Sequence, residues 1–479
     1  MRKKLLPALL FALLAGKADA PAAAKDAKDQ VEKYVESQRA DFSAIAKKIW
    51  ELAEVGYQEE ESSSLLRSTL QSAGFQVETG VAGMPTAFVA HYGEGKPVIG
   101  ILAEFDALPG LSQEVATQRR PRINDAAGHG CGHHLFGTAS TAAAIAVKQW
   151  LAGSRTPGTI RLYGTPAEEG GGGKVYMVRA GLFDDVDAVL TWHPGDRNDA
   201  SPTRSLANKS AKFRFHGVSA HAAGAPEKGR SALDGVEAMD SMVNLMREHV
   251  PSDARIHYVI TRGGGAPNVV PDFAEVYYYC RHPQVETVNE IWQRIVNAAE
   301  GAAMGTGTRV DYEIIHGIYS KLPNEHLQHL VDENLRRVGG FEYTAEERAF
   351  AEEIRKTLDS PELPIGSQQE VQPFHSHTTS SSTDVGDVSW VVPTASFTAA
   401  TWVPGTPAHS WQAVAAGGMS IGFKGMSLAA KTLAMTAVDL FTDPAHLTRA
   451  LEELRGAQGP DFQYRSLVGD RDPPLDYRK

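Results

Sequence analysis

The spacing of apolar residues divides the chain into stretches with different rhythms. Apolar positions from Val31 to Leu52 recur at helical spacing, and Val98 to Phe105 is a short apolar run typical of a buried strand. Helix-like and strand-like segments then alternate as far as about residue 205, with helices expected over 135–151 and 175–180 and further strands over 159–164 and 188–192. This alternation predicts parallel βα units around a sheet that is buried on both faces.

The rhythm changes at about residue 206. The pattern there predicts, in order, a strand over 212–216, a long helix over 231–250, strands over 255–261 and 274–280, and a helix over 285–303. Such an order suits a separate α+β unit with an antiparallel sheet. The βα pattern resumes beyond about Ile318 and ends in a long helix over 419–441. We therefore expect a catalytic domain in two parts, 25–205 and 318–479, interrupted by a smaller domain over 206–317.

The N-terminus has the layout of a secretory signal peptide. Three basic residues are followed by an apolar stretch, Leu5 to Ala15, that is too short to span a bilayer, and then by small residues. We assign residues 1–24 to this signal, with cleavage after Ala20 or near Ala24; a buried first helix is the alternative. The expected location is periplasmic or secreted. No other segment is long and apolar enough for a membrane span, so none is expected after signal removal.

Charge and cysteine content exclude two classes of protein. The net charge of −11 over 479 residues argues against nucleic acid as a partner, because phosphate binding needs a basic face. Only two cysteines occur, Cys131 and Cys280, which excludes a disulfide scaffold. At least one of them therefore needs another explanation.

One explanation is a glycine-rich cluster, Gly-His-Gly-Cys-Gly-His-His, at residues 128–134. Glycines let the backbone turn tightly, so that soft and borderline ligands, a thiolate and imidazoles, can converge on one point. A helix is expected to begin here, and its N-terminus favours the thiolate form of Cys131. A glycine-rich turn with surface histidines is the alternative.

A second cluster, Thr-Pro-Ala-Glu-Glu-Gly-Gly-Gly-Gly, occupies residues 165–173, just past the end of an expected strand. The carboxyl ends of strands are where open α/β sheets bind ligands. Adjacent carboxylates repel one another, so Glu168 beside Glu169 is best explained if a cation holds one and the other transfers protons. A solvated pair of glutamates is the alternative.

Further ligand-type side chains follow other strand ends and loops. His193 ends an apolar strand, and His409 lies in a late Pro-Gly-Thr-Pro-Ala-His loop. With the two clusters above, they offer more ligands than a closed structural zinc site needs, which fits two catalytic ions. Asp106, at the end of the strand over 98–105, could orient a ligating imidazole; a turn-capping role before Pro109 is the alternative.

These segments together resemble a known family. The motifs that carry the resemblance run in order from about residue 30 to about residue 445: AEFDALPGLSQ from Ala103, GHGCGH from Gly128, EEGG from Glu168, TWHP from Thr191, SALD from Ser231, PNVV from Pro267, STDVGDVSW from Ser382 and GTPAH from Gly405. The chain is similar to peptidase family M20, subfamily D, which includes aminoacylases, hippurate hydrolases and auxin-conjugate amidohydrolases. Within that family it looks like the branch that cleaves p-aminobenzoyl-glutamate.

The resemblance implies a fold and a site. The expected fold is a Zn-peptidase-like βα sandwich with an inserted ferredoxin-like lid that also forms a homodimer contact. Two divalent metal ions per subunit, zinc or manganese, are implied, together with a possible second kind of subunit. The implied ligands are Cys131, His133, Glu169, His193 and His409. The implied base is Glu168, the lid histidine that reaches the partner's active site is His221, and the substrate is held by Asn268 and Arg281.

The implied activity is hydrolysis of the amide bond of a small N-acyl amino acid, with an N-aroyl group favoured, by a metal-activated water and a glutamate base. A dipeptidase or carboxypeptidase of the same family is one alternative, and a non-catalytic periplasmic solute-binding protein is another. His134 departs from the family pattern, where relatives carry Asp or Asn; it could alter the surroundings of the ligands or add a titrating group. Three aromatic residues, Tyr258, Trp402 and Trp411, could line an aryl pocket or fill the core.

Overall fold

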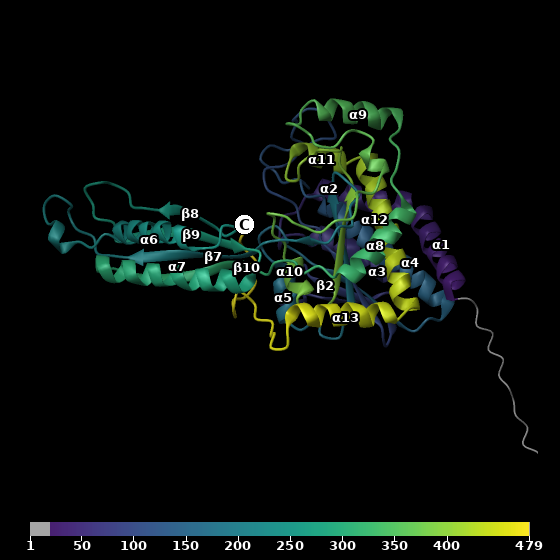
Figure 1. Cartoon of the computed structure of the whole chain (residues 1–479). Helices are drawn as coiled ribbons and strands as arrows, with labels where there is room; N and C mark the ends of the chain where they lie inside the picture. The colour runs from purple at the N-terminus through teal and green to yellow at the C-terminus, as the bar shows by residue number, and fades with distance from the viewer. Residues whose placement is uncertain (1–19, 479) are drawn as a thin grey trace, which may run out of the picture.

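The structure is a computed structural model that describes residues 20–478. It has a large lobe around a six-stranded sheet and a smaller, elongated lobe around a four-stranded sheet (Figure 1). The signal peptide expected over residues 1–24 falls mostly outside the described residues, which begin with helix α1 at Ala20. Within the described part of the chain, no helix is long and apolar enough to cross a membrane.

The sheet of the large lobe has the strand order β1-β2-β4-β3-β5-β12. Strands β4, β3, β5 and β12 are parallel neighbours, whereas β2 runs antiparallel to both β1 and β4. The bounds are β1 Gln76–Thr79, β2 Phe88–Glu94, β3 Val98–Ala103, β4 Gly158–Gly164, β5 Ala188–Gly195 and β12 Thr394–Ala400.

The sheet is therefore mixed: β4, β3, β5 and β12 form the part that the predicted parallel βα units describe, and β1 and β2 add an antiparallel edge. The sequence pattern missed the hairpin-like pair β1 and β2, because β1 is short and mostly exposed and the outer half of β2 is polar. A half-buried edge pair lacks the continuous apolar run that marked the inner strands.

Two layers of helices cover the sheet. One face packs on a large core with α4 and α12 at its centre, while the other packs on the short helices α5 and α10 and on C-terminal residues from Tyr464 onward. The first layer contains α1 Ala20–Ser37, α2 Arg39–Leu52, α3 Glu60–Ser72, α4 His133–Ser154, α8 Glu325–Val338, α12 Ser420–Thr442 and α13 Ala445–Gln458; the second contains α5 Gly173–Arg179 and α10 Val385–Ser389.

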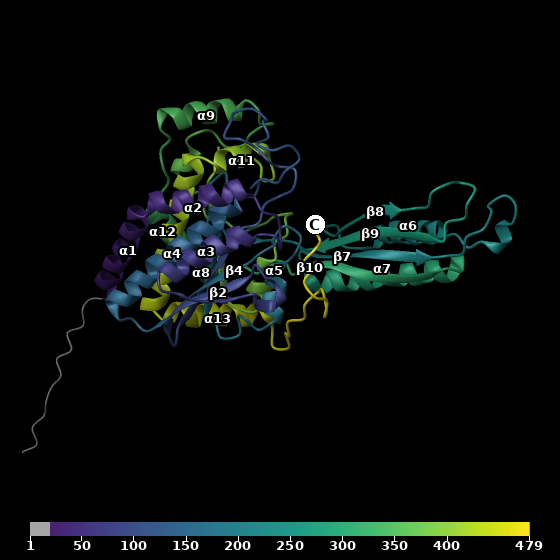
Figure 2. The same cartoon turned by 180° about the vertical axis from the view of Figure 1, so that it is seen from behind.

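Smaller elements complete this lobe. The helix expected over 31–52 is two helices, α1 and α2, separated at Gln38, and α13 follows the helix that was expected to be the last. Helices α9 (Ala345–Arg355) and α11 (Trp411–Gly417) share a minor core at one end (Figure 2). A two-stranded parallel ribbon pairs β6 (Thr203–Arg204) with β11 (His377–Thr378).

The smaller lobe has the order β7, α6, β8, β9, α7, β10 along the chain and β10-β7-β9-β8 in the sheet, all antiparallel. This is the ferredoxin-like arrangement, and it confirms the predicted α/β fold class with an inserted α+β lid. The helices pack on one sheet face around Phe213, Tyr278 and Trp292. The bounds are β7 Ala207–His216, α6 Ala232–Met246, β8 Arg255–Arg262, β9 Phe273–His282, α7 Val285–Thr306 and β10 Arg309–Ile318.

Candidate active site

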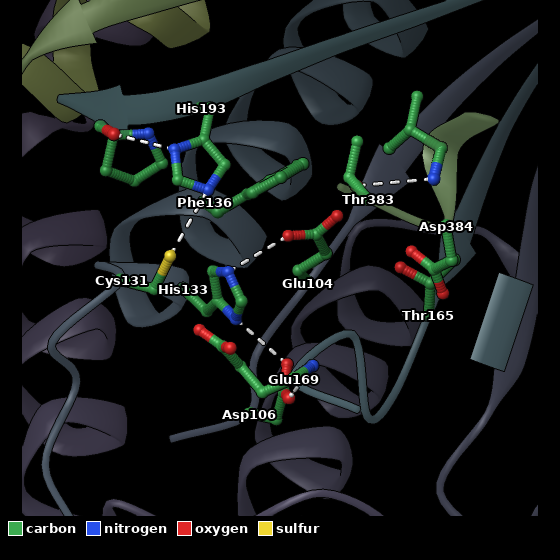
Figure 3. Close-up of polar contacts among 12 residues, drawn as sticks. Glu104, Asp106, Cys131, His133, Phe136, Thr165, Glu169, His193, Thr383 and Asp384 are labelled. Atoms are coloured by element: carbon green, nitrogen blue, oxygen red, sulfur yellow. Dashed lines mark hydrogen bonds and ion pairs between the residues drawn. The ribbon is translucent and has the colours of Figure 1, made fainter. Parts of the chain in front are cut away.

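The predicted ligands gather at the carboxyl ends of the parallel strands. Figure 3 shows His193 on β5, Glu169 after β4, Asp106 after β3 and Cys131 two residues before α4. Glu168 directly precedes Glu169. Because β4, β3 and β5 are parallel neighbours, their ends meet at one edge of the sheet. Residues far apart in the sequence are thereby brought to one point.

The ring of His133 is held in one orientation by Asp106. Its Nδ1 donates to the Asp106 carboxylate at 2.9 Å, so Nε2 is left as the ligand atom. The other oxygen of Asp106 accepts the backbone N–H of Glu169 at 3.0 Å. One buried carboxylate therefore positions both a ligating imidazole and the loop that carries the acidic pair.

The other ligand-type atoms lie close around this ring. Cys131 Sγ is 3.4 Å from His193 Nε2, whose Nδ1 donates to the Pro194 carbonyl at 2.7 Å. His409 Nε2 is 3.0 Å from Glu169 Oε1. Ligand atoms within 4.8 Å of one another form three overlapping groups: Cys131, His133 and His193; Cys131, Glu169 and His409; and Glu104, His133 and Glu168.

The residues present fit divalent metal ions. His133 Nε2 and Glu104 Oε2 are buried and face one another at 3.1 Å, and the buried Glu169 Oε1 faces His409 Nε2 at 3.0 Å, but none of these three atoms makes a regular hydrogen bond. Burial, with Glu169 nearby, raises the pKa of the Cys131 thiol well above its usual range, and this outweighs the helix N-terminus that was expected to favour the thiolate. A bound cation would favour the thiolate instead and would give these closely spaced ligand-type atoms a common partner. Thiolate, imidazole and carboxylate together are the donor set of zinc-type ions.

Glu168 lies beside the same ligand-type atoms, but its carboxyl group is suited to a different role. Burial, together with the carboxylates of Glu104 and Glu169, raises the pKa of its carboxyl group well above the usual range. A raised pKa makes a carboxylate a stronger proton acceptor, which is the property that a general base requires. Glu168 lines a cavity of about 680 Å³, which is also lined by Cys131, Glu169, His193 and His409.

The sequence did not assign a role to a buried charge network beneath the ligands. Lys174 Nζ lies 2.7 Å from Glu104 and 2.7 Å from Asp384, and all three side chains are almost fully buried. Glu104 Oε2 in turn is 3.1 Å from His133 Nε2. Glu104 and Asp384 lie inside motifs of the family resemblance. Their shared partner Lys174, however, is 70 residues from Glu104 and 210 residues from Asp384 in sequence, so local patterns do not reveal the network.

The loop with the acidic pair is fixed from several sides. Ala167 has a positive φ of 57°, and its N–H donates to the buried Glu59 carboxylate at 2.8 Å. At the C-terminal end of the chain, Tyr477 Oη and an Arg478 guanidinium nitrogen donate to the Glu169 carbonyl at 3.0 and 2.9 Å. Neither contact could be predicted from local sequence, because the partners come from distant segments.

The three residues predicted on the lid are not brought to this cavity. His221 and Asn268 lie side by side on the surface of the lid, where Ala222 N donates to the Asn268 carbonyl at 3.0 Å. Arg281, on β9, has its Nε buried and unpaired beside Tyr279. None of the three lines the cavity that contains Glu168.

His134 does not join the site as a titrating group. Its Nε2 bonds to the Gly417 carbonyl at 2.9 Å and its ring packs on His129, on the side away from the ligands. Burial, with His129 as a neighbour, lowers the pKa of His134 well below its usual value, so the ring is neutral. The aromatic residues that line the cavity are Phe136, Trp192 and Phe397; Tyr258 stacks on Tyr278 in the lid, and Trp402 and Trp411 belong to the core near α9 and α11.

The chain is similar in sequence to known proteins. The model of the Peptidase family M20/M25/M40 matches residues 100–398. One of the subunits of the p-aminobenzoyl-glutamate hydrolase of Escherichia coli (strain K12) is 43% identical over 450 residues, which is 88% of this chain and 94% of that protein. The Xaa-Arg dipeptidase of Mus musculus is 29% identical over 430 residues, which is 86% of this chain and 89% of that protein.

A solved structure supports the same fold. The YXEP protein of Bacillus subtilis, a dinuclear metal binding peptidase from the M20 family, superposes with a TM-score of 0.58 at 17% sequence identity, covering 85% of this chain and 99% of that one. The family match spans more than half of the chain and includes most of the candidate ligands. The alternative that the protein is a non-catalytic solute-binding protein is therefore rejected. The chain belongs to the M20/M25/M40 family of peptidases and is a metal-binding hydrolase of amide bonds.

Proposed function

We propose that this protein hydrolyses N-acyl amino acids, in particular N-aroyl amino acids such as p-aminobenzoyl-glutamate. The substrate is suggested by the name of the 43% identical relative. We further propose two divalent ions per subunit, zinc or manganese, held by Cys131, His133, Glu169, His193 and His409, whose ligand atoms fall into the overlapping groups described above.

The observation that carries the proposal is the position of Glu168. Its half-buried carboxyl group forms no ion pair with a lysine or arginine in the described residues, lies within 4.8 Å of His133 and Glu104 ligand atoms, and lines the cavity. A purely structural site has no use for a free carboxyl group with a raised pKa beside its ligands.

The chain's own residues then supply the chemistry around an amide bond. Metal ions, when bound, make water a nucleophile near neutral pH and polarise the carbonyl group. Glu168 accepts a proton from the attacking water and delivers it to the leaving amine as the C–N bond breaks. Asp106 keeps the His133 ring oriented throughout. The aromatic side chains of Phe136, Trp192 and Phe397 offer a surface for an aryl group.

The test is amide hydrolysis by Glu168→Gln, with the exposed Glu60→Gln as the matched control. We expect metal-loaded wild type and Glu60→Gln to release p-aminobenzoate from p-aminobenzoyl-glutamate. Glu168→Gln should lose about a hundredfold or more in kcat, the usual scale of general-base catalysis, while elemental analysis shows the same metal content. Full activity of Glu168→Gln would refute the role, and turnover of dipeptides alone would favour the dipeptidase alternative.

We also propose that the mature protein is periplasmic or secreted and forms a homodimer through its lid. The support is the basic and apolar layout of residues 1–24 and the long lobe that projects from the catalytic domain (Figure 1). A second, different subunit is a further candidate partner, because two different subunits are named for the Escherichia coli hydrolase. N-terminal sequencing of the exported protein and its mass by light scattering test these points.

A further inference from the structure

A lysine with no acidic partner lies in the cavity. Lys321 lines the same cavity as Glu168 and His193. Its Nζ donates to Ser396 Oγ at 2.9 Å, and within the described residues it forms no ion pair with any carboxylate. Burial lowers the pKa of its ammonium group to about 8, with no other contribution. A desolvated charge without a counter-ion is costly, so the site is incomplete as it stands.

The other charged groups of the cavity are already occupied. Arg197 is paired with Asp196 at 2.8 Å, and an Asp199 oxygen accepts the Ser201 N–H at 2.8 Å. Glu104 is paired with Lys174. Glu168 and Glu169 lie with the metal-type ligands. Lys321 is therefore the cation of this cavity that remains available to an incoming anion.

One hydroxyl group contacts the lysine, and a second lies beside the first on the neighbouring strand. Thr191 on β5 and Ser396 on β12 are direct partners of the parallel strand pair. Thr191 lines the cavity and is 3% exposed, and its buried Oγ1 has no hydrogen-bond partner among the described residues. Ser396 accepts from Lys321 and keeps its own hydroxyl hydrogen for a ligand. Lys321, Thr191 and Ser396 thus bring an ammonium group and two hydroxyl groups to one cavity, and such donors are suited to bind a carboxylate.

These donors are next to the reaction centre. Thr191 and His193 are two residues apart on β5 and so point to the same face of the sheet, about 7 Å apart along the strand. That spacing matches a small molecule whose amide carbonyl lies at the ligands while a carboxylate a few bonds away reaches the lysine.

We propose that Lys321, with the hydroxyl groups of Thr191 and Ser396, binds a carboxylate of the substrate. The inference rests on the proposed function, and it makes the carboxylate-binding cation a residue of the catalytic domain rather than Arg281 of the lid.

The experiment compares three substrates with wild type, Lys321→Met, Lys321→Arg and a matched control, Lys148→Met on α4. The substrates are p-aminobenzoyl-glutamate, its glutamine analogue without the side-chain carboxylate, and its isoglutamine analogue without the α-carboxylate. Lys321→Met should lose tenfold or more in kcat/KM on the glutamate compound but lose little on the one analogue that lacks the bound carboxylate. The analogue on which little activity is lost shows whether Lys321 binds the α-carboxylate or the side-chain carboxylate. Lys321→Arg should retain more activity than Lys321→Met.

Equal losses on all three substrates, or no loss on any, would overturn the inference. Calorimetric binding of glutarate to the metal-loaded protein separates it from the proposed function. Glutarate should bind at least tenfold more weakly to Lys321→Met than to wild type and Lys148→Met. If it does, but wild type hydrolyses no N-acyl amino acid, then the carboxylate site is supported and the proposed function is refuted. If wild type hydrolyses the substrates, but Lys321→Met has the same kcat/KM and the same affinity for glutarate as wild type, then only the carboxylate site is refuted.

Discussion

At the scale of single residues, the site depends on carboxylates that orient other groups. Asp106 uses one oxygen for His133 Nδ1 and the other for Glu169 N–H. In Asp106→Asn one of these N–H groups would face an amide NH₂ instead of an oxygen. We expect metal affinity to fall by about tenfold to a hundredfold, the usual cost of losing such an orienting partner.

Chelator competition on the purified protein measures that loss. The exposed Asp125→Asn is the matched control, since its left-handed backbone accepts asparagine. Equal metal affinity of Asp106→Asn and wild type would show that the ring of His133 is held by its packing rather than by this hydrogen bond.

The buried Lys174 leads to a prediction about stability. In Lys174→Met the carboxylates of Glu104 and Asp384 would lose the cation that lies 2.7 Å from each. Breaking a buried ion pair from one side leaves uncompensated charge, so the free energy of unfolding should fall by about 3–5 kcal/mol. Urea denaturation of Lys174→Met and of the double variant Lys174→Met/Asp384→Asn checks the cause. The double variant should recover part of the loss, and no recovery would mean that packing rather than charge is responsible.

At the scale of elements, the C-terminal segment links the lid to the acidic loop. Arg471 donates to the carbonyls of Ile314 and Ile315 on β10, and Tyr477 and Arg478 donate to the Glu169 carbonyl. Deleting residues 471–479 should loosen the loop over 165–173. We expect faster hydrogen exchange in that loop and a kcat reduced by roughly tenfold to a hundredfold, because small displacements of catalytic groups are costly. Unchanged exchange and unchanged kcat would show that Glu59 and Asp106 alone position the loop.

Helix α10 carries a pH-dependent contribution to stability. Asp387 is fully buried and accepts the Tyr319 N–H and the Tyr464 hydroxyl at 3.0 and 2.6 Å, and burial raises its pKa to about 7. Between about pH 4 and pH 7 this carboxyl group is ionised in the unfolded chain but neutral in the folded one, so its contribution to stability is lost as pH rises. Asp387→Asn, which can keep both contacts, should gain on the order of 3 kcal/mol relative to wild type from pH 4 to pH 8. Urea midpoints across that range test it, and a constant difference would contradict the raised pKa.

The same scale shows what could be predicted from the sequence. Buried strands such as β3 and β5 were visible as apolar runs, and the ligands next to them followed from the rule that ligands bind at strand ends. The edge pair β1 and β2 was missed because half-exposed strands lack such runs. Glu59, Lys174, Lys321 and Tyr477 were missed for another reason: their roles arise from contacts between segments far apart in sequence, and no local pattern encodes those contacts.

At the scale of the whole molecule, the position of His221 raises the question of how many chains complete one active site. His221 is exposed on the lid and does not line the cavity of its own subunit, and the lid projects away from the catalytic domain (Figure 1). The residue can reach a reacting group only if the lid closes or if it serves the cavity of a second subunit. The family resemblance favours the second arrangement, and we predict that a homodimer shares His221 between subunits.

Mixing two inactive variants separates these arrangements. His221→Ala keeps Glu168, and Glu168→Gln keeps His221; in a mixed dimer one of the two cavities regains both groups if the histidine comes from the partner subunit. With random exchange of subunits, half of the dimers are mixed, so activity should return to about one quarter of the wild-type value. Each variant mixed with itself is the control and should stay inactive. If the histidine acts within its own subunit, no cavity in any dimer contains both groups, and mixing would restore nothing.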